Sequence, residues 1–193
     1  GKHIDQSNPD INQQAHIVSA ETEKWRWLAS NADDFVANGK VLIFVSGKAA
    51  TEELCKSLNA HFRARQLDIG VEALHGDKDQ SERSTVLKKF TNSSSTGSIS
   101  NNTSLLVATD IASRGLDIQN VRTVVNVDVL KNIETYVHRI GRTGRMGKAG
   151  VVPGTAHTLL VSGPSAANFA VALVHNLRLS SLPVNLQLQR LAE

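Results

Sequence analysis

Short, uninterrupted apolar runs are the feature that most limits how this chain can fold. The clearest reads VLIFV at residues 41–45, and a second reads LLVA at residues 105–108. Such runs are typical of strands that are buried on both faces, as in a parallel sheet. The segments between them show helical periodicity; in one of them Leu54, Leu58 and Phe62 recur at every fourth position. The chain is therefore expected to alternate between strands and helices.

This alternation predicts an α/β fold in which helices cover both faces of a parallel sheet. We expect strands at residues 15–20, 41–45, 71–74, 105–108, 121–127 and 155–161. We expect helices at residues 21–38, 49–65, 79–90, 132–140 and 164–177. Asp79 and Glu82 form a capping-box pattern at the start of the third helix, and Asn132 is placed to cap the fourth.

The 193 residues, 40% of them apolar, are enough for one domain with a packed core. We expect that domain at residues 15–178, after a tail or linker at 1–14 and before a C-terminal extension at 179–193. Residues 91–104 read TNSSSTGSISNNTS, and this polar composition predicts a flexible surface insertion. Because the sequence begins with Gly rather than Met, we expect further protein upstream.

Two classes of protein are disfavoured by composition. No apolar run approaches the roughly 18 residues that a membrane-spanning helix needs, so no membrane partner is expected. Cys55 is the single cysteine, which excludes an internal disulfide and a metal site built on two cysteines. A reducing, intracellular compartment fits this cysteine usage.

Basic residues concentrate in one part of a chain whose net charge is only +3. Between residues 131 and 148 the basic residues are Lys131, Arg139, Arg142, Arg145 and Lys148, against the single acid Glu134. Residues 136–145 read YVHRIGRTGR, so the arginines recur at every third position and two glycines interrupt the helix between them. Guanidinium groups presented by a loop are suited to phosphate oxygens. The pattern is not a Walker A loop, because Ala149 stands where that loop needs Ser or Thr.

Polar residues also follow two of the expected strands, and ligands of open α/β sheets bind beyond the carboxyl ends of strands. After residue 74 come His75, Gly76 and Asp77, followed by Gln80 and Arg83. Taken alone, this segment is better explained as a tight turn with a helix cap and one exposed arginine. The segment after residue 108 contains Thr109, Asp110, Arg114 and Asp117. Those residues suit a nucleic-acid backbone and a sugar hydroxyl, or else an Asp-rich turn with an internal Arg114–Asp117 pair.

Together these segments resemble the DEAD-box RNA helicases over residues 15–178. The sequences LLVATDIASRGLDI, VVNVD and YVHRIGRTGR are similar to motifs V and VI and the segment between them, VLIFVSGK is similar to motif IV, and HGDKDQSER is similar to the segment after it. The sequences KWRWL, DQSER and SGPSAANFAVALVHNL further resemble the splicing-linked subgroup associated with the SF3b particle.

The resemblance implies the second, RecA-like lobe of an ATP-dependent helicase. The ATP site would include Gly115 and Asp117, with Asp117 at the ribose. Arg142 and Arg145 would reach the γ-phosphate as arginine fingers. His138 and Arg139 would link this motif to the nucleotide site and the other lobe. The RNA backbone would be bound by the following residues: Gly76, Gln80, Arg83, Thr109, Asp110 and Arg114.

The resemblance also implies what this chain lacks. The first lobe, with its phosphate loop and its ligands for the Mg²⁺ bound with ATP, is not in the sequence, so this chain alone should not hydrolyse ATP. The implied partners are RNA, the N-terminal RecA-like lobe of the same protein and spliceosomal proteins. The implied location is the nucleus, with the cytoplasm as the alternative. The chain departs from the family pattern at Val127, in the long segment 91–104 and at residues 152–154.

Three alternatives remain at this point. The sequence IGRTG at residues 140–144 fits the backbone clamp of a KH-type RNA-binding module, although that clamp should lead into an apolar helix. A lobe from a DNA-acting helicase would carry similar chemistry. The arginines could also be surface residues without a ligand.

Overall fold

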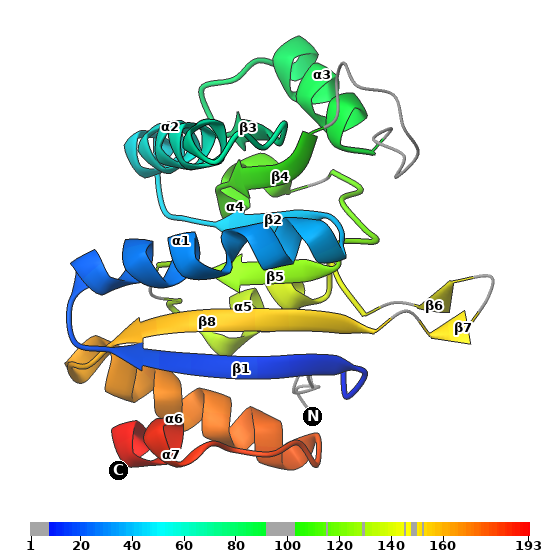
Figure 1. Cartoon of the computed structure of the whole chain (residues 1–193). Coiled ribbons are helices and arrows are strands. Elements are labelled where there is room, and N and C mark those ends of the chain that lie inside the picture. Colours follow the sequence, from blue (N-terminus) through cyan, green and yellow to red (C-terminus); the bar gives the residue numbers. More distant parts are fainter. Residues whose placement is uncertain are drawn as a thin grey trace.

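A six-stranded parallel sheet forms the centre of the molecule (Figure 1). The computed structural model describes residues 8–91, 103–114, 116–128, 130–144, 146–147, 150–151 and 153–193. The order of the sheet is β1-β8-β5-β2-β4-β3, and each neighbouring pair is parallel. Its strands are β1 (Ile11–Val18), β2 (Val41–Phe44), β3 (Gly70–Leu74), β4 (Thr103–Ala108), β5 (Thr123–Asn126) and β8 (Gly154–Val161). This arrangement confirms the predicted α/β class.

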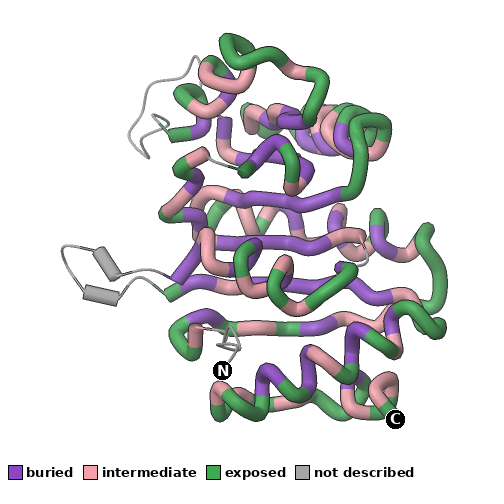
Figure 2. Tube along the Cα trace, turned by 180° about the vertical axis from the view of Figure 1, so that it is seen from behind, coloured by how far each residue is buried: buried purple, intermediate pink, exposed green. Residues whose placement is uncertain are grey.

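Helices cover both faces of the sheet. Successive residues of a strand point to opposite sides, so a strand that is apolar throughout needs a packing partner on each face. The helices are α1 (Glu21–Asn38), α2 (Lys48–Ala64), α3 (Gln80–Thr91), α4 (Asp110–Ser113), α5 (Ile133–Ile140), α6 (Pro164–Leu179) and α7 (Leu186–Ala192). On β2, Val41 and Ile43 belong to the core shared with α1 and α2, whereas Leu42 and Phe44 belong to the core shared with α3 to α7. Figure 2 shows the central strands buried along most of their length.

The two helix caps predicted from sequence are confirmed. The Asp79 backbone N–H donates to Glu82, and the Glu82 backbone N–H donates to Asp79 Oδ1, at 2.9 and 2.8 Å. The Asn132 side chain accepts a hydrogen bond from the Thr135 backbone N–H at the start of α5. Such caps bind backbone N–H groups that have no partner inside the helix.

The ends of the predicted domain differ in detail from the structure. Strand β1 begins at Ile11 and pairs with β8, so residues 11–14, assigned to the tail by sequence, belong to the sheet; residues 1–7 lie outside the described part. The segment expected as an extension contains α7, which packs on α6 and β1, with Leu188 buried (Figure 1). Of the predicted insertion, residues 92–102 lie outside the described part, and Thr103 already starts β4.

Two further features complete the fold. Strands β6 (Met146–Gly147) and β7 (Gly150–Val151) form an antiparallel pair shortly after the arginine-rich segment.

Within the ranges given above, no helix combines the length and the apolar character needed to cross a membrane.

Candidate functional site

The carboxyl ends of the parallel strands bring most of the sequence-predicted site residues to one edge of the sheet. A hollow of about 170 Å³ lies there between α4 and α5. It is lined by Phe44, Asp110, Ser113, Arg114, Thr135, His138, Arg139 and Arg142. Five of these residues were predicted from sequence as catalytic or RNA-binding, and they come from two segments separated by more than twenty residues. We call this hollow the α4–α5 pocket.

Arg139 is the most buried charged residue of the α4–α5 pocket. Its Nε and Nη2 atoms donate to the two carboxylate oxygens of Asp110 at 2.7 and 2.6 Å. The guanidinium also lies over the ring of Phe44, 5.0 Å from its centroid. A two-bond arginine–carboxylate pair fixes both direction and distance. Arg139 therefore fastens α5 to the turn that follows β4.

A buried asparagine extends this contact into the sheet. Arg139 Nη1 donates to Asn126 Oδ1 at 3.3 Å, and Asn126 Nδ2 donates to Thr158 Oγ1 at 3.1 Å. Sequence analysis did not single out Asn126 or Thr158. One signal was available: Asn126 interrupts an apolar run, and a buried amide needs hydrogen-bond partners.

Arg142 lies just beyond the end of α5. Its Nη1 donates to the Leu116 carbonyl at 3.3 Å, and the residue is half-buried. The next residue, Thr143, is buried and its hydroxyl donates to the Arg122 carbonyl. Gly144 has a φ of 68°, and a Cβ there would stand 2.5 Å from Ile11 Cγ1. The backbone that presents Arg142 is thus packed closely against the body; Arg145 lies outside the described residues.

The predicted ribose contact lies apart from the α4–α5 pocket. Asp117 is exposed, and the described residues contain no ion pair between it and Arg114, which answers one alternative left by the sequence. Gly115 lies outside the described residues. Within the described ranges, no group of three or more His, Cys, Asp or Glu side chains is placed to hold a metal ion.

The second group of predicted residues lies on the turn between β3 and α3. Gly76 and Gln80 are exposed. Arg83 reaches back to the same turn, where Nε donates to the Lys78 carbonyl at 3.0 Å and Nη2 to the Gly76 carbonyl at 3.1 Å. Arg83 therefore stabilises the conformation of this turn through two hydrogen bonds to its backbone.

The strand pairing places the turn beside the α4–α5 pocket. Strands β3 and β4 are neighbours, with Leu74 opposite Ala108, so the two groups of residues begin at adjacent strand ends. Thr109 is buried and its hydroxyl accepts from the Ala112 backbone N–H, which starts α4. A larger hollow of about 530 Å³ lies between α1 and α2, and none of the sequence-predicted site residues lines it.

The sequence is similar to those of known helicases. Residues 23–147 match the family model described as the helicase conserved C-terminal domain. The chain is 45% identical to the ATP-dependent RNA helicase DDX42 of Xenopus laevis over 189 residues, which is 98% of this chain and 18% of that protein. The chain thus spans less than a fifth of that relative's length.

Solved structures show the same likeness. The C-terminal domain of the DEAD-box protein Dbp5 superposes with a TM-score of 0.63 at 26% identity, covering 89% of this chain and 86% of that one. The yeast DEAD-box splicing factor Prp28 superposes with a TM-score of 0.74 at 26% identity, covering 96% of this chain and 37% of that one.

Proposed function

The chain belongs to the helicase conserved C-terminal domain family and is the C-terminal lobe of a DEAD-box helicase. We propose that this lobe completes the ATP site of an ATP-dependent RNA helicase and forms half of its RNA-binding groove. The observation that carries the proposal is the α4–α5 pocket, where Asp110, Arg114, His138, Arg139 and Arg142 converge beside the β3–α3 turn. Both lie at the carboxyl edge of the sheet, where ligands of such folds bind.

Arg142 acts in this proposal as an arginine finger on the γ-phosphate of ATP. Phosphoryl transfer depends on positioning and on stabilising the charge of the transferred group, so a fixed guanidinium is an effective catalyst. The close packing of Thr143 and Gly144 supports this role, because it fixes the backbone that presents Arg142. Arg145 is proposed as the second finger on sequence grounds. The exposed carboxylate of Asp117 accepts hydrogen bonds from the ribose, together with the backbone at Gly115.

Arg139 and His138 have supporting roles in the same proposal. Arg139 is held by Asp110, Asn126 and Phe44, and its proposed role is to keep α5 in place beside the nucleotide site. His138 lines the α4–α5 pocket and faces the nucleotide or the preceding lobe. We propose that the preceding lobe also holds the Mg²⁺ bound with ATP, as the family resemblance implies.

RNA is bound through its backbone. Gly76, Gln80, Arg83 and Arg114 are proposed to contact phosphates and 2′-hydroxyls, which gives binding without base recognition. Thr109 and Asp110 already have partners within the lobe, namely Ala112 and Arg139. They contribute to the RNA groove chiefly by holding the turn that carries Arg114.

The partners and the location follow from the likeness to splicing-linked proteins. One similar solved structure is named as a splicing factor, and several segments of this sequence resemble the SF3b-associated subgroup. We therefore propose spliceosomal proteins as partners and the nucleus as the location.

The alternatives from sequence are less well supported. In a KH-type module the glycine loop leads into a helix, but here residues 141–144 are followed by strand β6. A DNA-acting lobe is disfavoured because the similar proteins above are named as RNA helicases or DEAD-box proteins. The reading of the arginines as surface residues fails for Arg139, which is buried.

The test compares this chain with a protein that also carries the preceding lobe. We expect ATP hydrolysis that is stimulated by single-stranded RNA in the two-lobed protein and no hydrolysis by this chain alone. ATP turnover by the purified chain would overturn the two-lobe proposal. Equal stimulation by single-stranded DNA would favour the DNA-acting alternative.

A further inference from the structure

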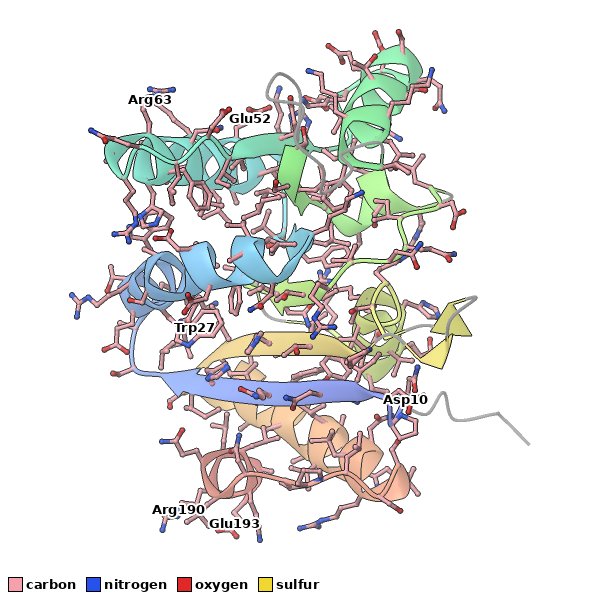
Figure 3. All side chains as sticks on the ribbon, turned by 45° about the vertical axis from the view of Figure 1, so that its right-hand side comes forward. Asp10, Trp27, Glu52, Arg63, Arg190 and Glu193 are labelled. Atoms are coloured by element: carbon pink, nitrogen blue, oxygen red, sulfur yellow. The ribbon has the colours of Figure 1, made fainter. Side chains whose placement is uncertain are left out.

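Two side chains of α2 contact the residues on either side of Gly76. Glu52 Oε1 lies 2.5 Å from His75 Nε2, and Lys48 Nζ lies 2.8 Å from Asp77 Oδ2. Lys48 and Glu52 are one helical turn apart and so share a face of α2. Figure 3 labels Glu52 on this helix. Two polar contacts thus join the first turns of α2 to the turn that follows β3.

The two contacts differ in how firmly they hold. Lys48 and Asp77 are both more than half exposed, so water competes with their pairing. His75 is only 4% exposed, and its Nδ1 has no hydrogen-bond partner among the described residues. Its Nε2–H therefore donates to Glu52, because a buried imidazole N–H needs an acceptor. Glu52 itself is 53% exposed, but its partner is buried, whereas both members of the Lys48–Asp77 pair are exposed. The Glu52–His75 contact is therefore the firmer of the two.

The opposite side of the turn is held by α3. Arg83 donates to the carbonyls of Gly76 and Lys78, and the Asp79/Glu82 capping box fixes the start of the helix. Gly76 itself is exposed, and a Cβ built there would have no neighbour within 4 Å. The turn is therefore supported on both flanks and open toward solvent at Gly76.

We propose that Glu52, acting through His75, is a positioning residue for the binding of RNA phosphates at Gly76 and Arg83. The inference rests on the proposed function, because it assigns a role within the proposed RNA groove. Glu52 does not touch RNA in this account. It holds the turn in the shape that presents the Gly76 backbone and the Arg83 guanidinium.

Simple electrostatics predicts the opposite effect, and this makes the inference testable. RNA is a polyanion, so removing a carboxylate near its binding groove should strengthen binding when the carboxylate has no other role. Glu53 provides the matched control. It is the next residue on α2, it is exposed, and no hydrogen bond or ion pair is found for it among the described residues.

The experiment uses the two-lobed protein and a fluorescent single-stranded RNA oligonucleotide. We expect Glu52→Ala to weaken RNA binding by about tenfold, the effect of one lost charge-assisted hydrogen bond. The RNA concentration for half-maximal ATPase should rise in parallel, while kcat at saturating RNA stays unchanged. Glu53→Ala, with the same change of charge, should leave RNA binding unchanged or slightly stronger. Glu52→Gln keeps an oxygen acceptor for His75 and should restore most of the affinity.

The same measurements can contradict the inference. Glu52→Ala that binds RNA as tightly as Glu53→Ala would overturn it, as would a loss of kcat at unchanged RNA affinity. If Glu52→Ala lowers the Tm of the protein, Glu52→Lys is compared with Glu53→Lys, which makes the same change of charge. Equal RNA affinities of these two variants would also overturn the role. Failure of the unmodified two-lobed protein to bind RNA would instead refute the proposed function.

Discussion

Arg139 and Asp110 form a two-bond ion pair whose members differ greatly in exposure. The Arg139 side chain is 5% exposed, whereas the Asp110 side chain is 39% exposed. Water can therefore solvate the carboxylate when its partner is removed, whereas it has little access to the guanidinium. Arg139 should therefore lose more free energy without Asp110 than Asp110 loses without Arg139.

This asymmetry predicts unequal effects of two substitutions. Asp110→Ala leaves a buried cation without its partner and should lower the free energy of unfolding by about 3–5 kcal/mol. Arg139→Leu leaves a hydrated carboxylate and keeps an apolar contact with Phe44. It also leaves Asn126 Oδ1 buried without its donor, so we expect a smaller cost of about 1–3 kcal/mol. Urea denaturation of this chain measures both. Equal costs would show that the exposure of Asp110 does not govern the pair.

Arg142 should matter for ATP turnover and little for folding. In the two-lobed protein, Arg142→Ala should lower kcat by about a thousandfold or more, the scale of an arginine finger. Arg142→Lys should restore little, because an ammonium lacks the planar fork of a guanidinium. The Tm of either variant should change only slightly. Arg63→Ala, which removes an exposed arginine of α2 (Figure 3), should leave both quantities unchanged.

A contrary result would be an increase in the RNA needed for half-maximal rate with kcat unchanged. That outcome would assign Arg142 to RNA binding. The ATPase rate measured against RNA concentration separates the two roles.

The fold class could be predicted from the sequence because the apolar runs and the helical periodicity fall on elements that are buried in the structure. The run at 41–45 became the central strand β2, and the residues of α2 with four-residue spacing, Leu58 and Phe62, are buried against the sheet. The ends of elements were less predictable. Strand β1 starts at Ile11 because pairing with β8 stabilises its polar residues, which hydropathy alone cannot show.

The sequence singled out several residues that the structure brings together in the α4–α5 pocket, but it did not show how they contact one another. Spacing and the family resemblance brought together Asp110, Arg114 and Arg142. They did not show that Asp110 is bound by Arg139, or that Asn126 completes the contact, because these partners meet only through tertiary packing. The roles given to individual residues toward ATP and RNA stay predictions.

A contact between the buried His157 and the half-buried His16 should make folding sensitive to mildly acidic pH. His16 Nε2 and His157 Nδ1 lie 3.0 Å apart, beside the ring of Trp27, a residue of α1 that Figure 3 labels. Burial, with a smaller contribution from His16, lowers the pKa of His157 from 6.5 to about 4. The unfolded chain then binds more protons than the folded chain between these two pH values. Stability should therefore be fully present above pH 6.5 and decline as the pH falls toward 4.

The matched variants are His157→Leu and His175→Gln. The first removes the buried titrating group and should reduce the loss of Tm between pH 7 and pH 5. The second changes an exposed histidine of α6 and should leave the pH profile as it was. An unchanged profile in His157→Leu would show that other groups cause the acid sensitivity.

Gly154 is expected to be essential for the loop that presents Arg142. A Cβ at Gly154 would collide with Thr143 Oγ1 and would stand 2.6 Å from the Gly144 nitrogen, so the loop must shift to admit it. We expect Gly154→Ala to destabilise this chain by about 1–3 kcal/mol, the usual cost of overpacking. In the two-lobed protein Gly154→Ala should also lower kcat, because the displaced loop carries the Arg142 guanidinium.

Gly163→Ala is the matched control, because a Cβ there meets no neighbour within 4 Å. It should cost at most about 1 kcal/mol as a weaker helix cap and should leave kcat unchanged. Denaturation and ATPase assays of the two variants decide the matter: full activity in a folded Gly154→Ala protein would mean that the loop position does not control turnover.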